Sequence, residues 1–441
     1  MSSRQRESSQ ELAAKIETTS AQIAVIGLGY VGLPLAVAFA EAGFSVTGID
    51  VDVDRVEQAR AGKSYISDVI PERLDAVVRA GRFHATADFT PLARADVVLI
   101  CVPTPMNKSR EPDISYIRLA AAQTQHYLHH GQLVILESTT YPGTTEEMLL
   151  PLFEQTGLKL DEDFFLAYSP ERIDPGNTVY LLRDIPKIVG GVSRTSGDLA
   201  EQLYRRIVTT VHRVSSARVA EAAKLLENTF RAVNIALANE FALLCRALSM
   251  DVWEVISAAA TKPFGFMPFY PGPGIGGHCI PVDPSYLTWK ARLHGFEPRL
   301  IGVAQEINSF MPHYVVDMVA EALNGQGKPV NGSHVLVLGV AYKRNVADVR
   351  ESPALAIIEG LLRRGARVSY ADPYIPQVTV NTTVLTSIEL SDELLQAADC
   401  ILIHTDHSAF DYRRVVERAR VVVDVRNATR DLGNCANVIR L

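Results

Sequence analysis

The stretch IAVIGLGYVGLPLAVAFAEAGFSVTGIDVD, residues 23–52, decides the fold of this chain. Gly27, Gly29 and Gly32 have GxGxxG spacing, an apolar strand pattern precedes them, and an alanine-rich helix pattern follows. Such glycines permit a tight turn and a close approach of the backbone, so that a pyrophosphate can bind at the helix N-terminus. Because glycine triplets also occur in loops without a ligand, a packing motif is the alternative.

A second strand pattern in this stretch ends at Asp50. An acidic residue at that position accepts hydrogen bonds from the adenosine ribose, and its charge repels a 2′-phosphate. The segment therefore predicts NAD, rather than NADP, as the cofactor. The residues predicted to bind it here are Gly27, Gly29, Tyr30, Val31, Gly32, Asp50 and Arg55.

The alternation of strand and helix patterns continues to about residue 213. Strands are expected at Ile23–Ile26, Phe44–Asp50, Val97–Cys101, Leu133–Glu137 and Phe165–Tyr168, and helices at Gly32–Ala42 and Ile114–Leu128. Continuous apolar strands separated by helices indicate a parallel, doubly wound sheet. The first twenty residues are polar and are expected to form a tail that is disordered or loosely helical.

From Ser215 to about Leu323 the pattern is mostly helical. One long helix is expected first, followed by shorter helices around Val252–Ala259 and Val303–Leu323. The segment Pro263–Pro284 is rich in glycine and proline and is expected not to form regular helix.

A second α/β pattern begins at His334, after the linker Gly325–Ser333. Its expected elements are a strand from His334, a helix at Pro353–Arg364, and strands at Ala366–Ala371, Cys400–His404 and Val421–Val425. The predicted fold class is therefore α/β, with two doubly wound parallel-sheet domains joined by a helical region. The expected boundaries are a tail at 1–20, and domains at 21–213, 214–325 and 326–441.

Composition and charge exclude several classes of function. The net charge of −7 provides no global basic field for nucleic acid or an anionic membrane, and no apolar run is long enough to span a bilayer. The five cysteines are scattered without a CxxC pair, so neither a metal site nor a disulfide framework is predicted. Reduced thiols and the absence of a signal-peptide pattern favour a cytoplasmic protein.

Two further motifs end strands at the edge where open α/β sheets bind ligands. Thr104 lies in ICVPTP and Thr139 in EST, and both are candidates for contact with the nicotinamide half of the cofactor. Each motif taken alone is more often a simple turn.

The segment PGPGIGGHCIPVDP, residues 271–284, is the most unusual in the chain. Its glycines and prolines favour a tight turn that would present the thiol of Cys279, whereas Cys101 and Cys245 lie in apolar patterns where cysteine is a small hydrophobe. A loop cysteine without chemistry is the alternative for Cys279. A nucleophilic thiol needs a lowered pKa or a nearby cation and base.

Candidates for those partners lie on either side of the turn. Lys224 and Asn228 are spaced i, i+4 and therefore share a helix face, although a snorkelling surface lysine is the alternative for Lys224. Asp283 follows Cys279 by four residues and is either a group that holds a water or a turn-capping aspartate.

The combined motifs resemble the UDP-glucose/UDP-N-acetylhexosamine dehydrogenase family from Ile23 almost to the C-terminus. The matching pieces are the glycine fingerprint, VPTP, ESTTYPGTT, YSPERIDPG, EAAKLLENTFRAVNIALANE, GPGIGGHCIPVDP and GVAYKRNVADVRESPA. The resemblance implies an N-terminal NAD-binding Rossmann domain, a central helical domain that forms a homodimer or a higher homo-oligomer, and a C-terminal Rossmann-like domain that binds UDP. It also implies NAD as cofactor and a UDP-sugar as substrate.

The resemblance assigns a role to each candidate residue. It implies that Cys279 is the nucleophile, that Lys224 and Asn228 stabilise an oxyanion, that Asp283 assists proton transfer through water, and that Glu171 promotes thioester hydrolysis. The implied UDP-sugar contacts are Glu171, Lys224, Asn228, Asn234, Tyr270, Gly272, Gly274, Gly276 and Lys343. The implied cofactor contacts beyond the fingerprint are Thr104, Thr139 and Arg350.

The implied chemistry explains why a cysteine is used. Oxidation of a primary alcohol gives an aldehyde, the thiolate captures it as a thiohemiacetal, and a second hydride loss gives a thioester that water cleaves. Lys343, in the first loop of the second α/β pattern, suits a phosphate of UDP, although a structural lysine is the alternative.

The residues around Cys279 bear on the sugar. UDP-glucose members of the family carry a lysine three residues after the nucleophile, where this chain has Val282, and a serine where it has His278. The segment therefore resembles the branch acting on UDP-N-acetylhexosamines, with UDP-GlcNAc favoured, then UDP-ManNAc, then UDP-glucose. Two other functions remain open: a two-electron dehydrogenase in which Cys279 is incidental, and a non-catalytic nucleotide-sugar sensor.

Overall fold

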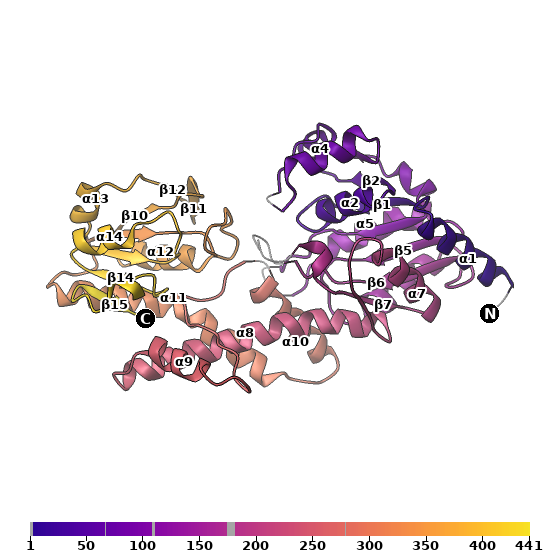
Figure 1. Cartoon of the computed structure of the whole chain (residues 1–441). Coiled ribbons are helices and arrows are strands. Elements are labelled where there is room, and N and C mark those ends of the chain that lie inside the picture. Colours follow the sequence, from indigo (N-terminus) through magenta and orange to yellow (C-terminus); the bar gives the residue numbers. More distant parts are fainter. Residues whose placement is uncertain (1–2, 67, 108–110, 174–180, 278) are drawn as a thin grey trace. The chain divides into compact units, whose positions relative to one another are not determined.

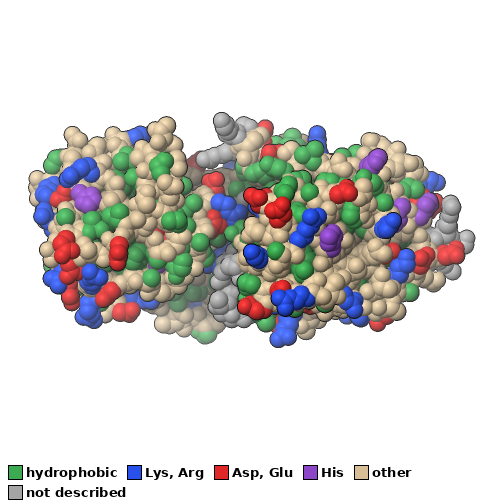
Figure 2. Space-filling model, turned by 90° about the horizontal axis from the view of Figure 1, so that it is seen from above, with side chains coloured by type: hydrophobic (Ala, Val, Ile, Leu, Met, Phe, Trp, Pro, Cys, Tyr) green, Lys and Arg blue, Asp and Glu red, His purple; other side chains and the backbone are tan. Residues whose placement is uncertain are grey.

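The computed structural model describes residues 3–66, 68–107, 111–173, 181–277 and 279–441. It divides into two compact units (Figure 1). Unit 1 comprises Met1–Glu227 and Ser285–Gly295, and unit 2 comprises Asn228–Pro284 and Phe296–Leu441. On the face that Figure 2 shows, positive and negative side chains are interspersed.

Unit 1 is built around one large sheet whose strands alternate with helices. Its elements are α1 (Ser3–Glu17), β1 (Gln22–Ile26), α2 (Gly32–Glu41), β2 (Ser45–Ile49), α3 (Val53–Arg60), α4 (Pro71–Arg79), β3 (Phe83–Thr86), η1 (Thr90–Arg94), β4 (Val97–Ile100), α5 (Ser115–Tyr127), β5 (Gln132–Leu136), η2 (Thr145–Leu149), α6 (Leu150–Glu154), β6 (Phe164–Tyr168), η3 (Leu182–Asp184), β7 (Lys187–Gly191), α7 (Arg194–Tyr204) and β8 (Val211–Arg213).

The strand order of this sheet is β3-β2-β1-β4-β5-β6-β7-β8. All neighbours are parallel except β6 and β7, which pair antiparallel. Ile23 and Val25 enter one core cluster, whereas Ala24 and Ile26 enter the other. Alternate side chains of β1 thus point to opposite faces, and both faces are buried, as the continuous apolar runs predict. The predicted doubly wound sheet is confirmed.

The N-terminal segment differs from the expected tail. Residues 3–17 form helix α1, and Leu12 and Ile16 are buried in the same core cluster as Ile23. The side chain of Lys15 also forms an ion pair with Asp96 at 3.0 Å. Of the two expected alternatives, disorder is wrong and a helix is present, but it is docked and not loose, because two apolar residues one turn apart are enough to pack a short polar helix against unit 1.

The middle of the chain is helical, as predicted. Its elements are α8 (Ala217–Ala247), α9 (Val252–Ala260), α10 (Cys279–Leu293) and α11 (Arg299–Gly325). Helix α10 corrects the expectation that Pro263–Pro284 contains no regular helix, since the last six residues of that segment are helical. Pro281 lies in the first turn, where a helix has no NH bond to lose, and only Pro284 removes an interior bond.

Unit 2 contains a second parallel sheet of order β10-β9-β13-β14-β15 and a separate two-stranded sheet, β11-β12. Its remaining elements are β9 (His334–Leu338), α12 (Pro353–Arg363), β10 (Arg367–Ala371), β11 (Gln377–Val380), β12 (Thr383–Thr386), α13 (Asp392–Ala397), β13 (Cys400–Ile403), α14 (Tyr412–Arg418), β14 (Val422–Asp424), η4 (Arg430–Leu432) and β15 (Val438–Arg440). The predicted second doubly wound sheet is therefore also present.

The helical region and the second sheet share one core. Cys245 of α8, Ile256 of α9 and Val315 of α11 lie in the same buried cluster as Val335 and Val337 of β9. Because these helices cover one face of the second sheet, most of the helical region belongs to unit 2.

Candidate functional site

The glycine fingerprint forms the turn between β1 and α2. The Gly27 NH donates to the carbonyl of Ile49 at 2.7 Å, and Gly27 has a φ of +93°, which favours glycine. A Cβ on Gly32 would lie 1.8 Å from the carbonyl oxygen of Gly27, so packing within the chain excludes one. A Cβ on Gly29 would meet nothing within 4 Å. Packing therefore does not require Gly29 to be glycine, and the space beside it is open.

Asp50 lies directly after β2 and is tied to this turn. One carboxylate oxygen accepts from the Leu28 NH at 2.7 Å, and the other accepts from the Asp52 NH at 2.9 Å. A guanidinium nitrogen of Arg55 lies 3.7 Å from a carboxylate oxygen of Asp50. The structure thus brings these predicted residues together around the loop. Tyr65, which no sequence signal indicated, donates its hydroxyl to the carbonyl of Leu28 at 2.9 Å.

The other residues predicted to bind the cofactor in unit 1 lie in the turn before α2 or after the carboxyl ends of β4 and β5. Tyr30 is exposed, and Val31 is the N-cap residue of α2. Thr104 lies beyond β4 and is buried, and its carbonyl accepts from the hydroxyl of Tyr286 at 2.8 Å. Thr139 lies beyond the neighbouring strand β5 and is half-buried.

Glu171 belongs to a buried network of charges in unit 1. The ammonium of Lys187 donates to Glu137 at 2.7 Å and to Glu171 at 3.2 Å, and all three residues are buried. The second oxygen of Glu137 accepts from the hydroxyl of Tyr204. Lys187 and Tyr204 were missed from the sequence, because a lysine that opens a short strand resembles an ordinary edge residue.

The two carboxyl groups of this network have different electrostatics. Burial raises the pKa of Glu137 to about 7, against the opposing charge of Lys187. Burial also acts to raise the pKa of Glu171, but the charge of Lys187, the NH groups of Ile173 and Arg172, and the charge of Lys224 together lower it below its usual value. The arrangement therefore keeps Glu171 as a carboxylate while Glu137 takes up a proton more readily.

Lys224 is held in the first third of α8. It is only 7% exposed, so it is not a snorkelling surface lysine. Three residues earlier, the buried carboxylate of Glu221 accepts from the NH groups of Gly143 and Thr145, at 2.5 and 2.9 Å. These bonds anchor the start of α8 to the loop that follows β5.

Asn228 and Asp283 form a buried pair in unit 2. The Asn228 amide donates to the Asp283 carboxylate at 2.5 Å, and both side chains are buried. Cys279 is the first residue of α10, and Asp283 follows it by one helical turn. The side chain of Cys279 and the whole of His278 lie outside the described part of the chain.

The loop that contains the predicted UDP-sugar contacts Tyr270, Gly272, Gly274 and Gly276 is held by asparagines on two helices. Asn239 of α8 accepts from the NH of Gly272 at 2.9 Å and donates to Asn308 of α11 at 2.9 Å. Asn239 is fully buried and was missed from the sequence. The predicted Asn234 instead donates to the Phe230 carbonyl of its own helix at 2.7 Å.

The rest of this loop is fixed at both ends. The exposed ring of Tyr270 stacks on Trp253, with ring centres 5.9 Å apart. Gly274 and Gly276 lie further along the loop, and the NH of Gly277 donates to the Arg350 carbonyl at 2.9 Å. Arg350 therefore belongs to unit 2, where its guanidinium pairs with the carboxylate of Asp348 at 2.6 Å. It was predicted as a cofactor contact, and this stays a prediction.

The first loop of the second sheet repeats the geometry of the fingerprint. Gly339 has a φ of +78° and its NH donates to the Ala371 carbonyl at 2.9 Å, while the Val340 NH donates to Asp372 at 2.7 Å. His407 also contacts Asp372, at 3.1 Å. The carboxylate of Asp372 is therefore occupied by protein donors. The half-buried Lys343 lies in the same loop, as predicted.

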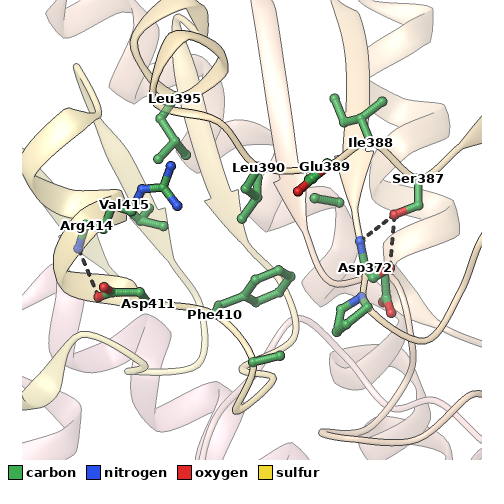
Figure 3. A pocket seen from close by; sticks show the side chains of 13 residues that line it. Asp372, Ser387, Ile388, Glu389, Leu390, Leu395, Phe410, Asp411, Arg414 and Val415 are labelled. Atoms are coloured by element: carbon green, nitrogen blue, oxygen red, sulfur yellow. Dashed lines mark hydrogen bonds between the residues drawn. The ribbon is translucent and has the colours of Figure 1, made fainter.

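A cavity of about 410 Å³ opens beside the carboxyl end of β10. Figure 3 shows Leu390, Leu395 and Phe410 facing it, with Arg414 and Asp411 on one side. None of the residues predicted from the sequence lines this cavity. Across the described residues, no group of three or more histidine, cysteine or acidic side chains is arranged to hold a metal ion. The helices in those same ranges include none that is both long and apolar enough to cross a bilayer.

Comparisons with known proteins give a consistent result. Three models of the UDP-glucose/GDP-mannose dehydrogenase family match in order: the NAD binding domain at residues 21–208, the central domain at 218–310 and the UDP binding domain at 336–431. The chain is 39% identical to the UDP-N-acetyl-D-glucosamine 6-dehydrogenase of Pseudomonas aeruginosa, over 80% of this chain and 83% of that protein.

Another relative is the UDP-N-acetyl-D-mannosamine dehydrogenase of Pyrococcus horikoshii, which is 37% identical over 93% of this chain and 96% of its own length. A solved structure of UDP-D-ManNAc dehydrogenase from the same organism has a TM-score of 0.87 at 36% identity, covering 95% of this chain and 98% of that one.

Proposed function

Because this chain belongs to the UDP-glucose/GDP-mannose dehydrogenase family and is an NAD-dependent UDP-sugar dehydrogenase, we propose that it oxidises the 6-hydroxymethyl group of a UDP-N-acetylhexosamine to the uronic acid. The preferred substrate is UDP-GlcNAc, and the reaction passes through a thiohemiacetal and a thioester on Cys279. The bound NAD accepts a hydride in each of the two oxidations.

The observation that carries this proposal is the buried pair formed by Asn228 and Asp283. Asp283 lies one turn after Cys279 on α10, and Asn228 donates to it from α8, so a buried carboxylate and a buried amide lie close to the first turn of α10. In the proposed reaction the thiolate of Cys279 is the nucleophile.

The proposal assigns the remaining roles to buried polar side chains. Lys224 and Asn228 donate to the oxyanion that develops when sulfur adds to the aldehyde carbon. Asp283 moves a proton through water, and Glu171 accepts a proton from the water that cleaves the thioester. A two-electron dehydrogenase would need none of these groups beyond a single acid or base.

The choice of sugar is supported by sequence and by relatives. Val282 stands where UDP-glucose members of the family carry a lysine. The relatives reported above are named for UDP-N-acetyl-D-glucosamine and UDP-N-acetyl-D-mannosamine, and the latter is the second candidate because its relative has the lower identity. A panel of UDP-sugars, assayed for NADH release, separates the candidates: UDP-GlcNAc should give the highest kcat/KM.

A stoichiometric assay tests the thioester route. The wild type should release two NADH for each uronate formed, and Cys279→Ala should form no uronate while binding NAD nearly as before. Cys435→Ala, which removes another thiol of unit 2, is the matched control and should leave turnover unchanged. One NADH per product, or uronate formation by Cys279→Ala, would contradict the proposal.

We also propose that the chain forms a homodimer through α8. Exposed apolar side chains recur on this helix at intervals of seven, four and three residues, which places them on one face. They are Phe230, Leu237, Phe241 and Leu244. Light scattering should find a dimer for the wild type and a monomer for Phe241→Glu, whereas a monomeric wild type would refute this interface.

A further inference from the structure

The reversed strand β7 brings a lysine to the edge of the sheet where ligands bind. The carboxyl ends of β4, β5 and β6 share one edge because these strands are parallel. Strand β7 runs antiparallel to β6, with Ala167 opposite Gly191 and Tyr168 opposite Gly190. Continuing this register places Lys187 opposite Glu171. In a fully parallel sheet, the first residue of β7 would lie at the far edge.

Lys187 donates to two carboxyl groups that have different hydrogen-bond partners. Glu171 also accepts from the NH groups of Arg172 and Ile173, at 2.6 and 2.7 Å, through the oxygen that does not contact Lys187. Glu137, by contrast, accepts from Lys187 and from the hydroxyl of Tyr204. Burial acts to lower the pKa of Lys187, but the charges of the two glutamates raise it above its usual value, so the lysine stays charged.

The charged and titratable groups that face Glu171 come from five elements or their ends. Lys187 lies on β7, Glu137 follows β5, and Lys224 lies on α8. Tyr204 of α7 and Cys101 after β4 adjoin Glu137, and burial keeps both neutral by raising the pKa of each. The two lysines are therefore the positive charges acting on Glu171, and Lys187 is the one that contacts it directly.

We propose that Lys187 is a positioning residue that holds Glu171 ionised and fixes the orientation of its carboxylate for the hydrolytic step, with Glu137 holding Lys187 in place. This inference rests on the proposed role of Glu171. In that step, a water oxygen bonds to the thioester carbon, Glu171 takes one water proton, and the carbon–sulfur bond breaks to release a thiolate and the uronic acid, which loses the second water proton to solvent. No electrons are transferred, and no further reactant is needed.

The decisive experiment is the pH dependence of kcat in Lys187→Met. Methionine has a similar length and no charge, so its introduction should move the acidic limb of the profile to higher pH by about one to three units, as expected for the loss of a contacting opposite charge. Lys187→Arg keeps the charge and should keep the wild-type limb. Glu137→Gln removes the other carboxyl group that Lys187 contacts, and it should not move the acidic limb of the profile to higher pH.

Removing one charge of a buried group can prevent folding, and the double variant Lys187→Met/Glu137→Gln addresses this. It removes a lysine and a glutamate together, so the net charge of the buried network does not change. It should bind NAD like the wild type and show the same upward shift as Lys187→Met. Below the shifted midpoint, intact-protein mass spectrometry should find the covalent sugar adduct accumulating on these variants.

Two outcomes are distinguishable. An unshifted acidic limb in a folded, NAD-binding variant that lacks Lys187 would overturn the role of Lys187 and leave the thioester route standing. Uronate formation without Cys279 would instead overturn the proposed function itself.

Discussion

Alanine at Gly29 and at Gly32 should separate ligand binding from packing within one turn. A Cβ on Gly29 meets no atom of the chain within 4 Å, so Gly29→Ala should leave the free energy of unfolding near that of the wild type. The methyl group would occupy the space that a pyrophosphate needs. Overpacking of that kind costs about 1–3 kcal/mol, which corresponds to roughly a 5- to 150-fold rise in the Kd for NAD.

Gly32→Ala should behave in the opposite way. Its Cβ would lie 1.8 Å from the carbonyl oxygen of Gly27 and 3.2 Å from the Cβ of Cys101. Backbone cannot yield as a flexible side chain does, so the turn and the start of α2 must shift, at a cost of about 3 kcal/mol or more in the free energy of unfolding.

Calorimetric titration with NAD and urea unfolding of both variants give the two quantities. Gly29→Ala should lose affinity without losing stability, and Gly32→Ala should lose stability first. If Gly29→Ala binds NAD as tightly as the wild type, the reasoning that assigns this open space to the cofactor is refuted. Equal stability of the two variants would refute the packing argument for Gly32.

Three other results are expected. Asp50→Ala should weaken NAD binding by about 1–3 kcal/mol, through the loss of charge-assisted hydrogen bonds, and an unchanged affinity would remove Asp50 from the site. Asn239→Leu should lower the free energy of unfolding by about 1–3 kcal/mol and weaken UDP binding, because the Gly272 NH loses its buried acceptor; unchanged UDP binding would contradict this. Burial acts to raise the pKa of Asp372, but hydrogen bonds from a buried histidine and from backbone NH groups lower this pKa below its usual value. The carboxylate of Asp372 therefore stabilises the fold above its unfolded pKa, and this stabilisation is lost as the pH falls through its folded pKa. Urea midpoints measured during acidification should therefore fall more steeply for the wild type than for Asp372→Asn, and parallel curves would contradict this.

The dinucleotide half of the site was accessible from the sequence because its signals are local. The spacing from Gly27 to Gly32 and the strand that ends at Asp50 lie within thirty residues, and the backbone turn itself brings Asp50 to the loop. The cysteine segment was also recognisable as unusual. The expectation of a presented turn missed that Cys279 begins a helix, since proline is compatible with a first helical turn.

Helix faces were harder to assign from spacing alone. Asn234 and Asn239 both lie on α8, and nothing in the sequence says which amide meets the loop at Gly272. That choice depends on how α8 rotates against α11, which is set by the packing of many side chains. The docking of α1 through Leu12 and Ile16 depends in the same way on a surface formed elsewhere in the chain.

By itself, the order of residues determined the two doubly wound sheets and the cofactor turn, because hydrophobic period and turn chemistry act between near neighbours. The direction of β7 was decided only by tertiary structure, and with it the meeting of Lys187 with Glu171 and Glu137. A short apolar strand has the same sequence pattern whether it pairs parallel or antiparallel, so the direction of β7 is decided by its pairing with β6 and β8.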